Sequence, residues 1–202
     1  MPSRRIVGGM TTHTHSARVP QIDDTMLADD ELREVIEDAA VTLSPPPQWY
    51  RTMGQNAEVA KAFRAYWDLL HRGGAVEHEI KELARLQIAQ MIGCEFCARQ
   101  ISPLADIDEE TKRSCALPHW EHPDPRTRAA LHYARTLVLD DGRDDEVYAE
   151  LKEHYTYAEI VELAAFFCLT MGGNRMAKSW GIEPEMGDVI PDGVMSVRAL
   201  AH

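Results

Sequence analysis

The sequence predicts an all-α protein with a single domain. Apolar residues recur at three- and four-residue spacing in one segment after another, and no segment alternates apolar and polar residues as a strand would. Capping residues and helix breakers stand between these segments. The chain has 202 residues, of which 45% are apolar, and this length suits one hydrophobic core.

The expected helices begin with one that Asp29 or Asp30 caps and that the prolines of 44–47 end. Asn56 caps the second, which ends at Gly73 and Gly74. The remaining helices are expected over 77–92 and 94–101, after Asp108, from Pro125, from Asp144 or Asp145, and from Thr156 to about Gly181. Residues 1–26 are expected to form a polar arm, 27–184 the domain and 185–202 a flexible tail.

The charge of the chain excludes some classes of partner. Lys and Arg number 21 against 33 Asp and Glu, so the formal net charge is −12. Such a chain repels the phosphate backbone of nucleic acids and anionic membrane surfaces. No run reaches the roughly 20 apolar residues of a membrane span, and no secretory signal is recognisable at residues 1–20. A cytoplasmic protein is therefore expected.

Two cysteines three residues apart, Cys94 and Cys97, carry the strongest chemical signal. A helix start favours the thiolate, and this spacing allows one sulfur to resolve a sulfenic acid on the other. The pair is also compatible with inert buried thiols, or with zinc if His119 and His122 supplied the other ligands. Cys115 and Cys168 have no partner at motif spacing, and Cys168 is expected to pack in the core.

A resemblance to a known family rests on these cysteines and on residues around them. The stretch 79–86 followed by 93–97 resembles the alkylhydroperoxidase AhpD-like family of the carboxymuconolactone decarboxylase superfamily. Residues 124–131 and 174–175 are also similar, and the likeness covers about residues 20–185. It implies an AhpD-like helical domain. Together with the two apolar faces of the 77–92 helix, it also implies a homo-oligomer built from dimers or trimers.

The resemblance implies a role for each matching residue. Cys97 is the thiolate that attacks the peroxide, Cys94 resolves the product, and Glu82 takes part in a proton relay. Ile101 stands where the family relay has a histidine. On an ideal helix Glu82 lies about 16 Å along the axis from Gly93, so something must connect it to the thiols. His78, four residues before Glu82, is a candidate substitute base, or else forms a solvated surface pair with it.

The implied function is that of a thiol-dependent alkylhydroperoxidase, a peroxidase-type oxidoreductase that a thioredoxin-like or lipoyl-bearing dithiol resets. The sequence has no haem, flavin or nicotinamide motif, so no cofactor is expected. Two alternatives remain open. One is a cofactor-free decarboxylase or lactone-processing enzyme on the same scaffold, and the other is a redox-responsive oligomer without enzymatic activity.

The C-terminal tail ends in an apolar patch, 194–200. This patch resembles the cargo-loading peptides of encapsulin nanocompartments, with Val197 and Leu200 as the anchors that would enter pockets on the shell. The alternative is that the tail docks on its own oligomer. The first interpretation would place the protein inside an encapsulin shell within the cytoplasm.

Overall fold

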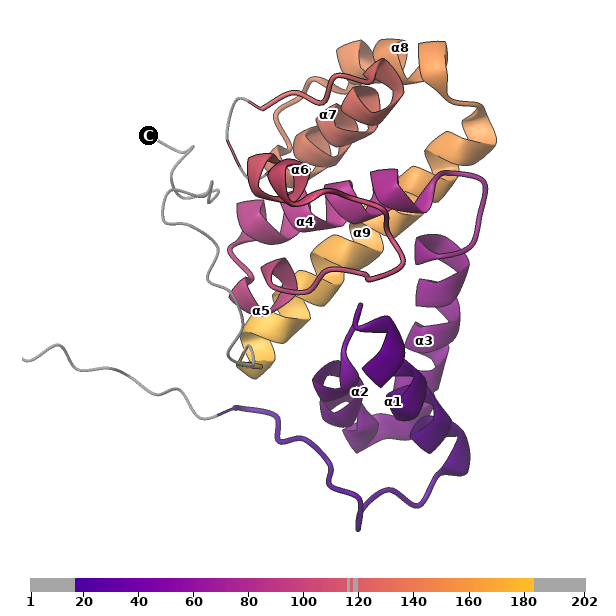
Figure 1. The fold of residues 1–202 in the computed structure, drawn as a ribbon, viewed down its shortest axis with the longest axis vertical. Coiled ribbons are helices and arrows are strands. Elements are labelled where there is room, and N and C mark those ends of the chain that lie inside the picture. The colour runs from indigo at the N-terminus through magenta and orange to yellow at the C-terminus, as the bar shows by residue number, and fades with distance from the viewer. Residues whose placement is uncertain (1–16, 116, 118–119, 184–202) are drawn as a thin grey trace, which may run out of the picture.

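The computed structural model describes residues 17–183 except 116, 118 and 119, and throughout these residues every regular element is a helix (Figure 1). The elements are α1 (Asp30–Thr42), α2 (Pro47–Met53), the 3₁₀ helix η1 (Gly54–Asn56), α3 (Ala57–His71), α4 (His78–Ile92), α5 (Glu95–Ala98), α6 (Glu109–Ser114), α7 (Pro125–Leu139), α8 (Asp144–His154) and α9 (Tyr157–Trp180). The predicted all-α class is confirmed.

Side-chain caps start most of these helices where the sequence predicts. The carboxylate of Asp29 accepts a hydrogen bond from the backbone N–H of Leu32, which identifies Asp29 as the cap of α1. Asn56, Asp108 and Asp124 cap α3, α6 and α7 in the same way. Thr156 and Glu159 form a reciprocal capping box at the start of α9. Each cap satisfies backbone N–H groups that have no partner within the helix.

Two local predictions differ from the structure. Helix α2 was not predicted, because Pro45 to Pro47 indicated only the end of α1, whereas Pro47 occupies the first turn of a new helix. Helix α5 ends at Ala98 rather than near residue 101. Helix α8 begins at Asp144, as predicted, although no side chain caps it.

Helix α4 lies at the centre of the fold and packs against α5, α7 and α9 (Figure 1). The predicted packing of this helix on the CxxC helix and on the last long helix is thus confirmed. Every residue from Ile80 to Ile92 is buried. The two apolar faces of this helix supported the expectation of a homo-oligomer. Because α5, α7 and α9 of the same chain cover it, its burial does not require a second chain.

Two hydrophobic clusters make up the core. One joins the end of α3 to α4, α7, α8 and α9, and the other joins α1, α2 and the start of α3 to α5 and the end of α9. Phe63 on α3 packs against both clusters. Cys94 and Cys97 belong to the second cluster, so the N-terminal helices and the end of α9 together enclose the CxxC segment.

The described part of the expected N-terminal arm packs on the domain. The backbone N–H of Arg18 donates to the carbonyl of Trp180 over 2.7 Å, and Ile22 is only 4% exposed. Residues 1–16 lie outside the described residues. The C-terminal tail from residue 184, including Val197 and Leu200, also lies outside them.

The position of Cys168 corrects a prediction. This residue was expected in the core, but its side chain is exposed on α9. Tyr157 and Val161 are 72% and 68% exposed on the same helix. Helix α9 is apolar around most of its circumference, so the pattern alone does not identify the side that α3, α4 and α7 cover.

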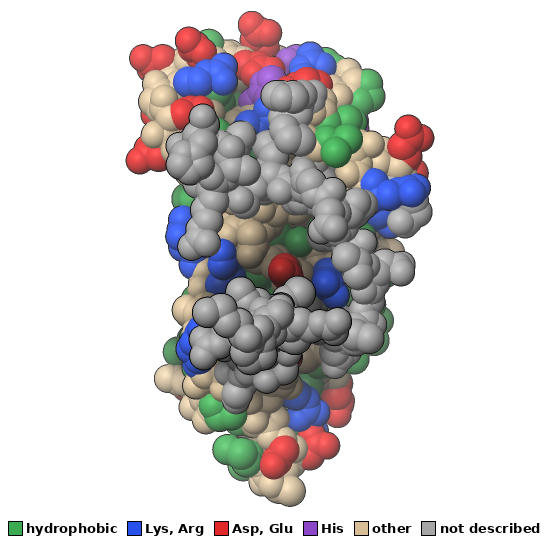
Figure 2. Space-filling view, turned by 90° about the vertical axis from the view of Figure 1, so that its left-hand side faces the viewer, with side chains coloured by type: hydrophobic (Ala, Val, Ile, Leu, Met, Phe, Trp, Pro, Cys, Tyr) green, Lys and Arg blue, Asp and Glu red, His purple; other side chains and the backbone are tan. Residues whose placement is uncertain are grey.

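Charged side chains are exposed along the molecule. On the face that Figure 2 shows, acidic and basic side chains lie at both ends, and histidine side chains are visible at the end where α7 and α8 lie. There His132 bridges Glu121 and Glu150, with nitrogen–oxygen distances of 2.7 and 2.8 Å. Within the described residues, no helix is long and apolar enough to cross a bilayer.

A buried ion pair joins the loop after α3 to helices α4 and α9. The ammonium of Lys81 is fully buried and donates to Glu162 over 3.0 Å and to the carbonyl of Gly73 over 2.5 Å. The carboxylate of Glu162 also accepts from the backbone N–H groups of Ala75 and Val76. Gly74 has φ +86°, and a side chain there would collide with this carboxylate.

We expect Glu162→Ala to destabilise the protein by about 3–5 kcal/mol, because it leaves the Lys81 ammonium buried without a counter-charge. Urea unfolding measures this change. The matched control is Glu146→Ala, which removes an exposed carboxylate 3.2 Å from Arg143 and should cost about 0.5 kcal/mol or less. Equal losses in the free energy of unfolding for the two variants would contradict a buried ion pair between Lys81 and Glu162.

Candidate active site

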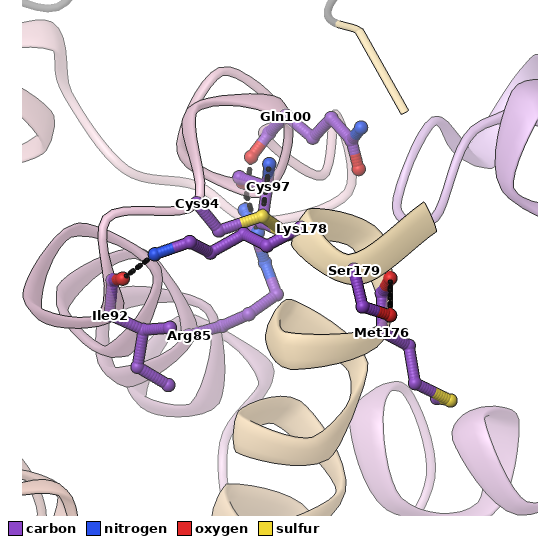
Figure 3. The surroundings of a disulfide bond; sticks show 8 residues. All are labelled: Arg85, Ile92, Cys94, Cys97, Gln100, Met176, Lys178 and Ser179. Atoms are coloured by element: carbon purple, nitrogen blue, oxygen red, sulfur yellow. Dashed lines mark hydrogen bonds between the residues drawn. A yellow bond between two sulfur atoms is a disulfide. The ribbon is translucent and has the colours of Figure 1, made fainter. Parts of the chain in front are cut away.

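The CxxC segment follows directly from the end of α4. Gly93 ends that helix in the left-handed conformation, with φ +70°, so the chain turns at once into α5. Cys94 caps α5, and its sulfur accepts a hydrogen bond from the backbone N–H of Cys97 over 3.3 Å. The two cysteines are joined by a disulfide, with their Cα atoms 5.3 Å apart (Figure 3).

The two sulfurs differ in their surroundings. Cys94 is 1% exposed and Cys97 is 8% exposed. Cys97 lines a small cavity of about 30 Å³, and Cys94 does not. The other lining residues are Ser44, Pro45, Trp49, Phe63, Trp67, Arg85, Phe96, Gln100, Thr170, Gly173 and Asn174. Any small molecule in this cavity would therefore meet Cys97 first.

Glu82 is fully buried, and four hydrogen bonds hold its carboxylate. Arg85 donates from Nε to one oxygen and from Nη2 to the other, each over 2.8 Å. The backbone N–H of Ser102 donates over 2.7 Å, and His71 Nε2 lies 2.8 Å from Oε2. A carboxylate without water requires such partners.

Arg85 connects this carboxylate to the CxxC segment. Its Nη1 donates to the carbonyl of Cys97 over 2.8 Å, and its Nη2 donates to the carbonyl of Gln100 (Figure 3). Glu82 and Gly93 lie far apart along the axis of α4, and the Arg85 guanidinium connects the Glu82 carboxylate to the CxxC segment. The same bonds occupy the carbonyl of Cys97 near the end of α5 and that of Gln100 just after it, where the helix stops short of its predicted length.

The charge on Glu82 follows from these partners. Burial alone would raise the pKa of this carboxyl group, but Arg85 and the hydrogen bond from His71 outweigh it and hold the pKa well below its ordinary value. Glu82 is therefore ionised at neutral pH. Because Arg85 pairs with it through two nitrogens, the charges balance inside the core.

His71 is a site residue that the sequence did not reveal. It ends α3, is fully buried, and stacks on Phe166 with the ring centroids 5.3 Å apart. Burial lowers its pKa from 6.5 to about 4, although Glu82 opposes this shift. The neutral ring donates from Nε2 to Glu82, which leaves Nδ1 without a hydrogen-bond partner in the described structure. The only sequence signal is a histidine on the apolar side of a helix.

His78 lies in the same region without touching Glu82. Its Nδ1 is 2.9 Å from the carbonyl oxygen of His71, and its Nε2 is 2.9 Å from the hydroxyl of Ser102. The rings of His71 and His78 meet edge to face at 4.5 Å. His78 is thus linked to the carboxylate through Ser102 rather than paired with it on the surface, because Glu82 turns inward to Arg85.

Cys115 and His122 do not line the cavity at Cys97. Cys115 is buried, donates from its sulfur to the carbonyl of Lys112 over 3.1 Å, and has a pKa that burial raises to about 12. His119 lies outside the described residues, while His122 accepts from the backbone N–H of Asp124. Across the described residues, no group of three or more His, Cys, Asp or Glu side chains is arranged to hold a metal ion.

A wider groove lies outside the small cavity. Its volume is about 560 Å³, and it shares Phe96 and Gln100 with the cavity. Helices α1 and α2 contribute Ala40, Pro47, Gln48 and Arg51, while the CxxC side contributes Arg99 and Ile101. Both polar and apolar residues line this groove, and it opens next to the cavity that Cys97 lines.

Comparison with known proteins places this site on a recognised scaffold. No family model matches the chain. The uncharacterised protein YdfG of Bacillus subtilis is 27% identical over 113 residues, which are 53% of this chain and 77% of YdfG.

Several solved structures share the fold over most of their length. The debrominase Bmp8 superimposes with a TM-score of 0.71 at 20% identity, covering 83% of this chain and 91% of Bmp8. An uncharacterised peroxidase-related protein from Ralstonia eutropha, described as an alkylhydroperoxidase AhpD core, gives 0.68 at 20%, covering 84% and 92%. A peroxidase-related protein from Silicibacter gives 0.71 at 18%, covering 88% and 96%. The chain therefore has the AhpD-like fold.

The shifted pKa of His71 makes stability depend on pH. Because the ring titrates near 6.5 when unfolded and near 4 when folded, its neutral form stabilises the fold above pH 6.5, and this stability is lost as pH falls towards 4. We expect the free energy of unfolding to drop by about 2 kcal/mol from this group between pH 7 and pH 5.

The variant His71→Gln retains an N–H donor for Glu82 but does not titrate. Urea unfolding at the two pH values should show a smaller drop for this variant than for the wild type. Equal pH dependence in the two proteins would contradict the burial of a neutral His71.

Proposed function

We propose that this protein is a thiol-dependent peroxidase of the alkylhydroperoxidase type. The observation that carries the proposal is that Cys97, half of a redox-capable CxxC pair, lines a cavity beside a buried Glu82–Arg85 ion pair. The AhpD-like fold supports it, because peroxidase-related proteins occur among the structural neighbours.

The reaction uses both sulfurs. The Cys97 thiolate attacks one peroxide oxygen, so a sulfur–oxygen bond forms while the O–O bond breaks and the leaving oxygen departs with the electron pair. That oxygen takes a proton and becomes an alcohol, or water when the substrate is hydrogen peroxide. The Cys94 thiol then attacks the Cys97 sulfenic acid, releasing water and forming the disulfide. A dithiol of the thioredoxin or lipoyl type returns two electrons and two protons.

The buried ionisable groups beside Cys97 position the sulfur and hold a proton. Arg85, held by the ionised Glu82, donates to the carbonyls of Cys97 and Gln100 and so positions the attacking sulfur. Glu82 and His71 share a hydrogen bond near the site, and this pair is where a proton is held. His78 is connected to the same hydrogen-bond network through Ser102. This assignment gives Glu82 the relay role that the family resemblance implies, with His71 as its direct partner.

The same proposal extends to assembly and location. A homo-oligomer is proposed, and the exposed apolar side chains Tyr157 and Val161 on α9 are a surface that a second copy could cover. We also propose a cytoplasmic location, as the sequence predicts. Recruitment into an encapsulin shell through Val197 and Leu200 stays a proposal that rests on the sequence of the tail.

Reductive debromination is a second candidate. Bmp8 is a debrominase, and a cysteine-to-alanine variant of it was solved with 2,3,4-tribromopyrrole. In this chain the rings of Trp49, Phe63, Trp67 and Phe96 line the cavity at Cys97, a lining that suits a flat aromatic ring. The decarboxylase alternative would keep Glu82 but would not use the thiols.

We expect one equivalent of peroxide to convert reduced Cys94 and Cys97 into a disulfide, detected by intact mass after alkylation of free thiols. Cys97→Ser should abolish this reaction, whereas Cys94→Ser should stop at a sulfenic acid on Cys97 that dimedone traps. Cys168→Ser is the matched control and should react like the wild type, since this cysteine is exposed and does not line the cavity.

The outcome separates the candidates. Dimedone trapping on Cys94 in the Cys97→Ser protein would reverse the assigned roles. A wild type that ignores peroxide but releases bromide from a bromopyrrole would favour debromination. If the double Cys→Ser protein turns over a carboxylated lactone, the decarboxylase alternative holds.

A further inference from the structure

Three side chains around the cavity at Cys97 carry polar atoms without a partner. These atoms are the indole Nε1 of Trp49, the hydroxyl of Thr170 and the amide Nδ2 of Asn174. Each residue is only 3% exposed, and among the described residues none of the three atoms makes a hydrogen bond. A buried donor left in this state costs about 1–3 kcal/mol, so three around one cavity call for an explanation.

The chemistry of the three atoms is similar. An indole N–H and an amide NH₂ can only donate, and a hydroxyl can donate or accept. They come from two separate elements, since Trp49 lies on α2 while Thr170 and Asn174 lie one turn apart on α9. Arg85, whose charge Glu82 balances, also lines this cavity. A group suited to this cavity is therefore small, rich in acceptor oxygens, and able to carry negative charge.

We infer that this cavity is the subsite for the peroxide group, with Trp49, Thr170 and Asn174 as its hydrogen-bond donors. The inference rests on the proposed function and adds the residues that bind the reacting atoms. As the Cys97 sulfur bonds to one oxygen, the other oxygen leaves as an alkoxide or hydroxide and gains a full negative charge. Donors held in place around that oxygen stabilise the charge as it develops, and the anion then takes a proton from water.

The size of the cavity fits this role. A volume of about 30 Å³ is enough to hold a water-sized group, so an O–O group fits in this cavity. The substituent of an organic hydroperoxide has room in the groove of about 560 Å³, which adjoins the cavity at Phe96 and Gln100. The donors thus contact only the part that all hydroperoxides share.

The test compares peroxide reactivity with general thiol reactivity. Thr170→Val removes the hydroxyl at nearly constant volume, and Asn174→Leu removes the amide. For each reduced variant, the second-order rate constant of disulfide formation is measured by stopped flow with hydrogen peroxide and with cumene hydroperoxide. The rate at which methyl methanethiosulfonate modifies Cys97 is measured in parallel, because that reaction needs no peroxide subsite.

We expect each variant to react about tenfold or more slowly with both peroxides, by a similar factor, with the methanethiosulfonate rate unchanged. The matched control is Tyr50→Phe, which also removes a buried hydroxyl but lies outside the cavity lining. Its peroxide rates should stay within about twofold of the wild type.

Distinct results overturn each claim. If the wild type forms the disulfide with peroxide and both variants match it, the subsite is wrong while the proposed function stands. The subsite is also wrong if the peroxide and methanethiosulfonate rates fall together, since the variants then disturb Cys97 itself. If the wild type does not react with either peroxide, the proposed function fails and the subsite fails with it.

Discussion

The buried ion pair between Glu82 and Arg85 is the interaction on which the candidate site depends. A carboxylate and a guanidinium in the core are tolerated only when each finds nearly all of its hydrogen-bond partners. Here those partners include the carbonyls of Cys97 and Gln100 and the backbone N–H of Ser102, so satisfying the charges also fixes the backbone around the cysteines. The hydrogen bonds that make the ion pair stable therefore also position the sulfur of Cys97, which lines the cavity.

Burial also sets the protonation states around this pair. Arg85 keeps Glu82 ionised, and desolvation keeps His71 neutral beside it, so one hydrogen bond links a charged base to an uncharged one. A positive His71 would add a second cation to a core in which Arg85 already balances the carboxylate. The cavity next to Cys97 consequently has fixed donors on its walls and a compensated charge behind them, an arrangement suited to a reaction that develops negative charge on oxygen.

The sequence predicted the fold well because most of its signals are local. Caps such as Asp29 and Thr156 act within one turn, and the CxxC spacing is visible within four residues. The site was predicted only where residues stand near one another in the chain, as Glu82, Cys94 and Cys97 do. His71 reaches Glu82 from a different helix, and Thr170 and Asn174 reach the cavity from the far end of the sequence, so tertiary packing alone reveals them. Cys168 was wrongly placed in the core for a related reason. Helix α9 is apolar around most of its circumference, so its sequence does not indicate which face is exposed.

Amide hydrogen exchange of the reduced protein, comparing wild type with Arg85→Lys, tests most directly whether this ion pair positions the CxxC segment. Lysine keeps the positive charge beside Glu82 but lacks the planar fork that reaches two carbonyls at once. The account predicts faster exchange confined to residues 97–102, with protection in α7 and α8 unchanged. Protection of residues 97–102 equal to that of the wild type would contradict the account, because the segment would then hold its position without Arg85.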